Sequence, residues 1–167
     1  MTSITHRKIF LLTVLASFII LLPGQSFCQV YTSSHVVTVV VQPVTVIQVN
    51  VGSINLNITG ANAIAGQDEM TVIDQSSILL WGTNSSMQKI TIKTDIATPI
   101  FVTKVVALNP GVGTAAPEVT LSTIAQDFVL NIGRSSGSSI LQYTGIALAS
   151  QGTGTDSHII TFTVQAQ

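Results

Sequence analysis

Residues Val36–Val51 read VVTVVVQPVTVIQVNV, a run in which valine dominates and no side chain carries a formal charge. Valine and isoleucine branch at Cβ, which favours an extended backbone and fits the pleated surface of a sheet. Pro43 has no backbone N–H and is therefore out of place in a central strand. The pattern predicts two strands with a break at Pro43, or one edge strand that changes sheets there.

Both faces of this run are apolar. Successive side chains of a strand point to opposite faces. The face expected toward the core carries Val37, Val39, Val41, Thr45, Ile47, Val49 and Val51, and the opposite face carries Val36, Val40, Val44 and Val46. An exposed, apolar edge strand invites pairing with another chain. We therefore expect either a hairpin and loops or another molecule to cover the second face.

A period of two recurs along the rest of the chain, as in Ile54, Leu56 and Ile58, which alternate with polar residues. Alternation of this kind is typical of half-buried strands. We expect strands near residues 35–42, 44–50, 53–59, 70–74, 77–81, 88–95, 99–108, 118–122, 127–132, 140–149 and 157–165. Many short strands with regular turns favour an antiparallel, two-sheet immunoglobulin-like sandwich, with a small β-barrel as the alternative.

The gaps between these strands carry glycine, proline, asparagine and serine, which suit turns. Breaks are predicted at residues 59–62, 82–86, 109–111, 133–139 and 152–156. The segment 133–139, GRSSGSS, is short enough for a hairpin loop. Residues 61–66 are the one stretch after residue 28 for which we expect a short helical turn.

The beginning of the chain has the layout of a secretory signal peptide. His6, Arg7 and Lys8 precede a fourteen-residue apolar run, residues 9–22, and small residues at 26 and 28 fit a cleavage site. We therefore expect residues 1–28 to be a signal peptide and residues 29–167 to form one sandwich domain. Phe27 occupies a position where a lipoprotein signal has a small residue, so ordinary cleavage is favoured over lipidation of Cys28. The predicted location is the periplasm, the cell surface or the extracellular space.

Charge is scarce, at 8% of all residues, against about 25% in typical domains. Without Arg7 and Lys8, four cations face seven carboxylates, a net charge of −3. Four dispersed cations do not make the basic patch that neutralises phosphates, so no nucleic-acid partner is expected. The single cysteine, Cys28, allows no disulfide within the predicted domain.

The sequence offers little for catalysis. Residues Asp156, Ser157 and His158 are adjacent, but neighbours on a strand point to opposite faces and do not make a triad. His35 lies at the mouth of the first predicted strand. The Asp68–Glu69 pair fits a solvated loop better than a hydrolytic pair. No acidic cluster has the spacing of a calcium loop. We therefore predict no catalytic residue, no metal site and no cofactor.

A binding module for glycans would need aromatic rings exposed beside a groove. The predicted domain contains only Trp81, Tyr31 and Tyr143 as Trp and Tyr residues, and such a tryptophan more often fills a core. Asn57-Ile58-Thr59 and Asn84-Ser85-Ser86 match the N-glycosylation pattern. A glycan- or ligand-binding module is the alternative prediction, with an exposed Trp81 or Tyr143 as its expected mark.

The two ends of the chain resemble those of bacterial fimbrial and surface-coat subunits. His158, Ile160, Phe162, Val164 and Ala166 alternate up to the C-terminus, with Gly154 shortly upstream, and Val37, Val39 and Val41 resemble an N-terminal extension. The chain departs from that pattern because it lacks a disulfide pair and has Ala166 in place of a penultimate tyrosine. The resemblance implies a secreted sandwich whose extension completes the sheet of a neighbour.

Taken together, these patterns predict a secreted, non-catalytic structural or adhesive protein of the cell surface or extracellular matrix. Its expected partner is another protein or a second copy, which pairs with an edge strand at Val36–Val51 or at His158–Val164. A glycan is a further candidate partner.

Overall fold

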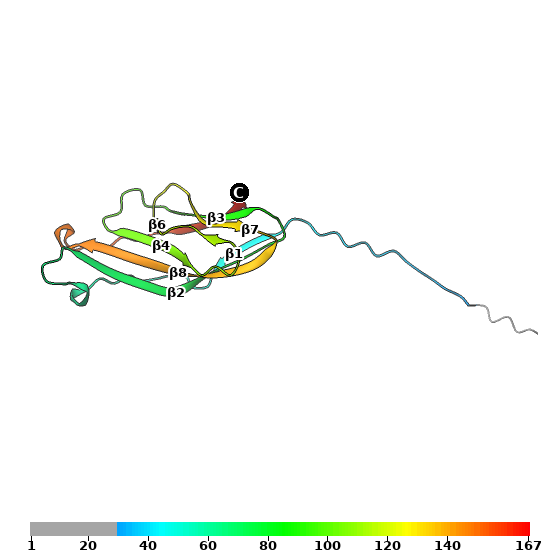
Figure 1. Cartoon of the computed structure of the whole chain (residues 1–167), viewed down its shortest axis with the longest axis horizontal. Helices are drawn as coiled ribbons and strands as arrows, with labels where there is room; N and C mark the ends of the chain where they lie inside the picture. The colour runs from blue at the N-terminus through cyan, green and yellow to red at the C-terminus, as the bar shows by residue number, and fades with distance from the viewer. Residues whose placement is uncertain (1–29) are drawn as a thin grey trace, which may run out of the picture. The chain divides into compact units, whose positions relative to one another are not determined.

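The structure is a computed structural model that describes residues 30–167. The predicted signal peptide, residues 1–28 with Cys28, lies outside the described residues. The chain divides into two units, Met1–Val40 and Val41–Gln167. Residues 30–40 of the first unit belong to no strand. The second unit consists of two antiparallel sheets in two layers (Figure 1), which confirms the predicted all-β, two-sheet sandwich.

One sheet has five strands in the order β1-β2-β8-β4-β6, and the other has four in the order β5-β7-β3-β9. The strands are β1 (Thr45–Val49), β2 (Glu69–Thr83), β3 (Gln88–Thr94), β4 (Val102–Leu108), β5 (Thr114–Ala115), β6 (Val119–Thr120), β7 (Gln126–Ile132), β8 (Ser135–Leu148) and β9 (Ile160–Ala166). Two short 3-10 turns, η1 (Gly60–Asn62) and η2 (Ala149–Gln151), complete the secondary structure of the described residues. The first falls at the edge of the helical turn that the sequence predicted at 61–66.

The antiparallel pair β2–β8 is the longest in the sandwich, running from Glu69 opposite Leu148 to Thr83 opposite Ser135. The sequence predicted two separate strands, 70–74 and 77–81, and this was wrong. Their register shifts between Asp74 and Ser77 without ending the strand. The Asp74 carboxylate accepts hydrogen bonds from the Ser76 backbone N–H at 3.0 Å and from its hydroxyl at 2.7 Å. These bonds hold a bulge inside one continuous strand.

The core lies between the two sheets and draws on both. Its buried residues are Leu79, Trp81, Ile90, Ile92, Val105, Ala107, Val119, Leu121, Phe128, Val129, Ile132, Leu141 and Tyr143. Ile47 and Val49 of β1 pack against this cluster, as the alternation after Pro43 predicted. Val37, Val39 and Val41, which were expected to face the core, are instead 73%, 82% and 75% exposed. The reason is that no described backbone pairs with residues 35–42, so the predicted strand there does not form.

The segment GRSSGSS was predicted to be a hairpin loop, and only its first two residues lie outside a strand. β8 begins at Ser135, and Gly137 sits opposite Trp81 of β2. The indole packs so closely on this glycine that a Cβ there would lie 2.6 Å from two of the ring carbons. Gly137 is therefore a packing residue inside a strand, not a turn residue.

We expect Gly137→Ala to lower the free energy of unfolding by about 1–3 kcal/mol, the usual cost of overpacking a well-packed core. Chemical denaturation monitored by the fluorescence of Trp81 measures this loss. Gly133→Ala is the matched control, because a Cβ at Gly133 meets no atom within 4 Å. Equal stabilities of the two variants would contradict the packing role of Gly137.

Candidate functional site

The free edge of β9 is the clearest candidate for a site of interaction. β9 pairs with β3 along its whole length, from Ile160 opposite Thr94 to Ala166 opposite Gln88. Within residues 30–167, no strand pairs with its other side. Ile160, Phe162 and Val164 face inward, and each of the three is only half-buried. The core is therefore incompletely covered beside this edge.

Other edges of the two sheets carry features that discourage strand addition, and β9 does not. β5 and β6 are two residues long, and a salt bridge between Lys104 and Glu118, with 3.5 Å between the charged atoms, lies beside β6. β1 starts two residues after Pro43. Short strands, charges and proline all protect sheet edges. β9 has seven residues, none of them charged and none a proline, so it is the least protected edge.

Residues 51–58 are a second segment whose backbone N–H and C=O groups lack hydrogen-bond partners among the described residues. The sequence predicted a strand at 53–59, but the structure shows no ladder there. Among the described residues, no backbone N–H or C=O of 51–58 makes a hydrogen bond to the protein. Even so, Ile54 and Leu56 pack against the core. Leu56 lies against Gly145 of β8, where a Cβ would come within 3.2 Å of it. The segment has the side-chain pattern of a strand without its hydrogen bonds.

This segment continues directly from β1, and β1 contacts β9 where the two sheets meet. Asn50 ends the pairing with β2. Its backbone N–H donates to the Ile78 carbonyl at 3.1 Å, and its side-chain oxygen accepts from the Ile78 N–H at 2.6 Å. Beyond Asn50 the backbone bonds stop. The free edge of β9 and residues 51–58, which follow β1, are thus two lengths of the described chain whose backbone groups lack strand partners.

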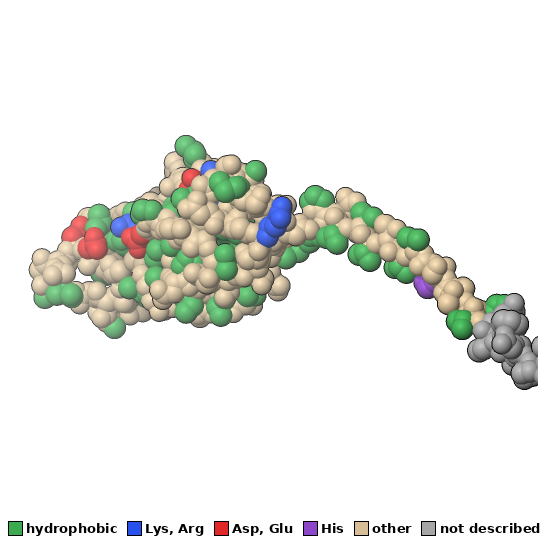
Figure 2. Space-filling view, turned by 45° about the vertical axis from the view of Figure 1, so that its right-hand side comes forward, with side chains coloured by type: hydrophobic (Ala, Val, Ile, Leu, Met, Phe, Trp, Pro, Cys, Tyr) green, Lys and Arg blue, Asp and Glu red, His purple; other side chains and the backbone are tan. Residues whose placement is uncertain are grey.

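Residues 36–42 are a third unpaired segment, and their side chains are strongly apolar. Val36, Val37, Val39, Val40 and Val41 are each at least 71% exposed. Figure 2 shows hydrophobic side chains along this segment, which contains no acidic or basic residue. Buried valines are the norm in folded proteins, so a continuous exposed run indicates an interaction surface.

Asn84 fixes the C-terminal end of this segment. Its side-chain oxygen accepts from the Val44 backbone N–H at 2.7 Å, and its side-chain N–H donates to the Gln42 carbonyl at 2.8 Å. The Asn84 backbone N–H donates to the Val44 carbonyl at 3.1 Å. Three hydrogen bonds therefore bracket Pro43. Sequence reasoning placed Asn84 in a turn and missed this role, because the partner lies forty residues away.

The start of β9 is fastened to the end of β3 by a small polar cluster. The Thr94 hydroxyl lies 3.0 Å from Nδ1 of His158 and 3.3 Å from the Asp95 carboxylate. The same carboxylate accepts from the Ile159 backbone N–H at 2.7 Å. Asp156 accepts from the Phe101 backbone N–H at 2.7 Å rather than from the imidazole. Asp156 and His158 therefore bond different partners, Phe101 and Thr94, and these contacts fasten the fold.

The other acidic residues serve similar structural roles. Asp68 accepts from the backbone N–H and the hydroxyl of Ser150 at 3.1 Å each, which ties η2 to the start of β2. Asp127 pairs with Lys89 at 2.7 Å. Within the described part of the chain, no three His, Cys, Asp or Glu side chains gather as metal ligands do. His35 is exposed.

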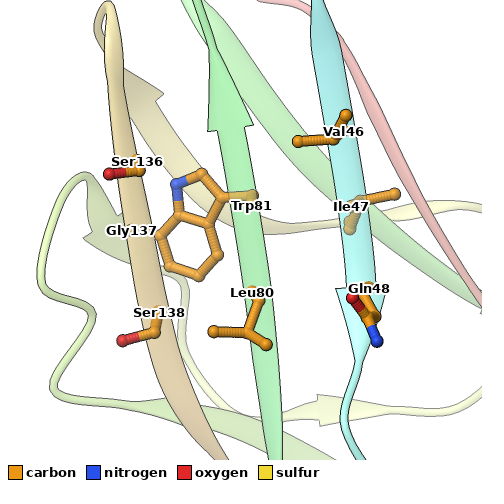
Figure 3. Close-up of a pocket in the computed structure, with 8 residues that line it drawn as sticks. All are labelled: Val46, Ile47, Gln48, Leu80, Trp81, Ser136, Gly137 and Ser138. Atoms are coloured by element: carbon orange, nitrogen blue, oxygen red, sulfur yellow. The ribbon is translucent and has the colours of Figure 1, made fainter.

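Trp81 and Tyr143, which a glycan-binding surface would need to expose, lie in the core. Trp81 and Tyr143 are each 4% exposed. Burial raises the pKa of the Tyr143 phenol, with a further contribution from the Asp74 carboxylate, so the ring stays neutral. A hollow borders Trp81 between β1, β2 and β8 (Figure 3), but the indole crosses to Gly137 of β8 inside the sandwich. Neither ring offers an open face for stacking.

The two asparagines that match the N-glycosylation pattern, Asn57 and Asn84, have different surroundings. Asn57 is exposed in the unpaired segment 51–58. The side-chain nitrogen of Asn84, which a glycan would modify, already donates to Gln42.

Among residues 30–167, no helix is both long enough and apolar enough to cross a bilayer.

We expect Asn84→Ala to lower the free energy of unfolding by about 1 kcal/mol, since it removes two side-chain hydrogen bonds. Hydrogen exchange should show faster exchange at the Val44 amide. Asn84→Asp is the matched variant, because it keeps the oxygen that accepts from Val44 and loses only the donor to Gln42. Unchanged exchange at Val44 in Asn84→Ala would contradict the clamp.

The pH dependence of stability should reveal the Asp95 contact. The hydrogen bond from the Ile159 N–H lowers the pKa of Asp95, and the Thr94 hydroxyl and His158 also lower it. A carboxyl with a lowered pKa stabilises the fold above its unfolded pKa of about 3.9, and that stability is lost as the pH falls through the folded pKa. Asp95→Asn, which keeps an acceptor oxygen, should lose less stability than the wild type between about pH 5 and pH 2. Identical acid dependence, measured by denaturation, would contradict this.

No protein-family model and no curated protein matches this chain.

Proposed function

We propose that this chain is a secreted, non-catalytic structural or adhesive protein of the cell surface or extracellular matrix, which associates with protein through an open sheet edge. The observation that carries the proposal is the free edge of β9, which is uncharged, seven residues long and incompletely covered. Main-chain hydrogen bonds to an added strand are a known basis of protein recognition at such edges.

Two further features support a structural role. The cations that remain after residue 28 are only four, and those on the sandwich include Lys89 and Lys104, which are both paired with carboxylates. His158 follows Asp156 and Ser157 in sequence, but its Nδ1 lies against the Thr94 hydroxyl, which joins the start of β9 to β3. These charged and titratable side chains thus make contacts within the fold.

The chain resembles fimbrial and surface-coat subunits in its terminal strand and its apolar N-terminal segment, and this resemblance favours export to the cell surface. The signal-like residues 1–28 agree with the same destination. N-terminal sequencing of the exported chain should find cleavage near residue 28. Retention of residues 1–28 in a soluble cell fraction would contradict the proposed location.

We expect residues 29–167 to self-associate, so that the average mass in sedimentation velocity rises between about 1 and 100 μM. Raising the salt from about 0.05 to 0.5 M should leave association unchanged, because screening acts on charges and the edge has none. A monomer over the whole concentration range would overturn self-association as the mode of assembly. Strong weakening by salt would overturn the apolar edge as the surface involved.

A further inference from the structure

We infer that two copies of this chain stack face to face through the outer face of the five-stranded sheet, around a two-fold axis that passes close to Ile140. This contact lies on a different surface from the open edge of β9 and goes beyond the proposed function. It joins side chains rather than backbone groups, so it leaves the edge of β9 free in both copies.

The two sheets differ in the side chains that point away from the core. On the four-stranded sheet these include Lys89 and Lys93 of β3 and Thr161 and Thr163 of β9. Such a polar outer face is usual, because antiparallel sheets commonly leave one face to solvent. The five-stranded sheet instead carries an apolar face, made of six outward side chains from four adjacent strands: Val46, Ile78, Leu80, Val106, Leu108 and Ile140.

Strand register brings the side chains of the apolar face together. Leu79 lies in the core, so its neighbours Ile78 and Leu80 point outward. Ile140 of β8 lies opposite Ile78 on one side and opposite Leu108 of β4 on the other. Leu80 is 40% exposed and Ile140 is 43% exposed. Ile140 is therefore the middle of a row of apolar side chains that crosses three strands and that water can reach.

The apolar face contains no charged residue. Among the outward residues of β1, β4 and β8, and of β2 beyond its bulge, the one charged side chain is Lys104, which pairs with Glu118. Gln142, two residues from Ile140 on the same strand, accepts a hydrogen bond from the Gln75 side chain. A highly charged partner would find no opposite charge here. A second copy of the same face buries no charge without a partner, so the charge pattern favours this chain as its own partner.

The sheet is also large enough for a stable contact. β2 has 15 residues and β8 has 14, so each is about 45–50 Å long at about 3.3 Å per residue. With β1 and β4 beside them at about 4.8 Å between strands, the sheet presents roughly 650 Å² before the relief of its side chains is added. A stable protein contact buries about 800 Å² on each partner. Two such faces can pack about 10 Å apart, as the layers of a sandwich do.

A two-fold axis follows from the use of one surface by both copies. In such a contact each residue of one copy meets the same patch of the other, and the assembly closes at two copies. An axis close to Ile140 places the row of Ile78, Ile140 and Leu108 on its own equivalent in the second copy. The expected product is a closed dimer, whereas pairing at a strand edge can continue from copy to copy.

Opposite charges at one position test this axis. Ile140→Glu and Ile140→Lys should each weaken dimerisation of residues 29–167 by about tenfold or more in sedimentation equilibrium, because like charges then lie buried near the axis. An equimolar mixture of the two variants should regain the dimer, since a carboxylate of one copy then faces an ammonium of the other. Thr163→Glu is the matched control on the exposed outer face of the other sheet, and it should change the affinity by less than about twofold.

The fold of these variants is verified by their thermal unfolding curves. Because Ile140 is 43% exposed, either charge can reach water in the monomer. If Ile140→Glu alters unfolding, Val46→Glu serves as the second variant, at a position of β1 that is 59% exposed. It should also weaken the dimer, because Val46 belongs to the apolar face. An undiminished dimer in a folded Val46→Glu, or a mixture of the Ile140 variants that stays monomeric, would overturn the stacking.

Hydrogen exchange separates this contact from pairing at the edge of β9. Stacking leaves the unpaired amides of β9 exchanging freely, whereas edge association protects them. If Ile140→Glu associates as the wild type does and the β9 amides become protected, stacking is overturned and the proposed function stands. If Ile140→Glu abolishes association and the β9 amides never become protected, stacking is supported and the edge is overturned. A wild type that stays monomeric at about 100 μM but floats with vesicles of neutral phosphatidylcholine would overturn the second copy as the occupant of the apolar face.

Discussion

Backbone hydrogen bonding is the constraint on which the rest of this structure depends. A buried N–H or C=O without a partner costs stability, and in this sandwich the pairing of strands supplies those partners. The long β2–β8 pair does so most completely, and β1 and β4 extend the pairing on either side. At the seam of β1 and β9 the pairing stops, although the side chains there still pack on the core. The candidate site is defined by that mismatch between side-chain burial and backbone bonding.

Much of the fold could be predicted from the sequence because alternation is a local signal. The inward positions of β3, β7 and β9 are apolar at every second residue, and the structure places Ile90, Ile92 and Phe128 in the core. One error came from a contact between distant residues, and another came from a local bulge. Gly137 was assigned to a loop because only its contact with Trp81 shows why a strand needs a glycine there. The predicted strand ended at Asp74, whereas the bonds of Asp74 to Ser76 form a bulge through which the strand continues.

The candidate site was predicted in part. Both segments predicted as edges, Val36–Val51 and His158–Val164, include backbone without a strand partner on one side. The strand expected at 53–59, however, shows that alternation alone does not predict strand pairing. Ile54, Leu56 and Ile58 alternate as strand residues do, and their side chains are covered accordingly. Nothing in a local pattern says whether a neighbouring backbone is available for the ladder. The role of Asn84 was out of reach for the same reason, since Gln42 and Val44 come beside it only through the pairing of β1 with β2.

The pairing of β9 with β3 also orders the folding of the chain in time. β9 ends at Ala166, and its partner β3 begins at Gln88, so more than sixty intervening residues must be present before this ladder closes. Contacts between residues so far apart in sequence form slowly. During synthesis from the N-terminus onward, the inner face of β3 therefore emerges before its cover. Until the last residues arrive, Phe128 lacks the ring of Phe162, which packs 5.5 Å from it in the finished sandwich.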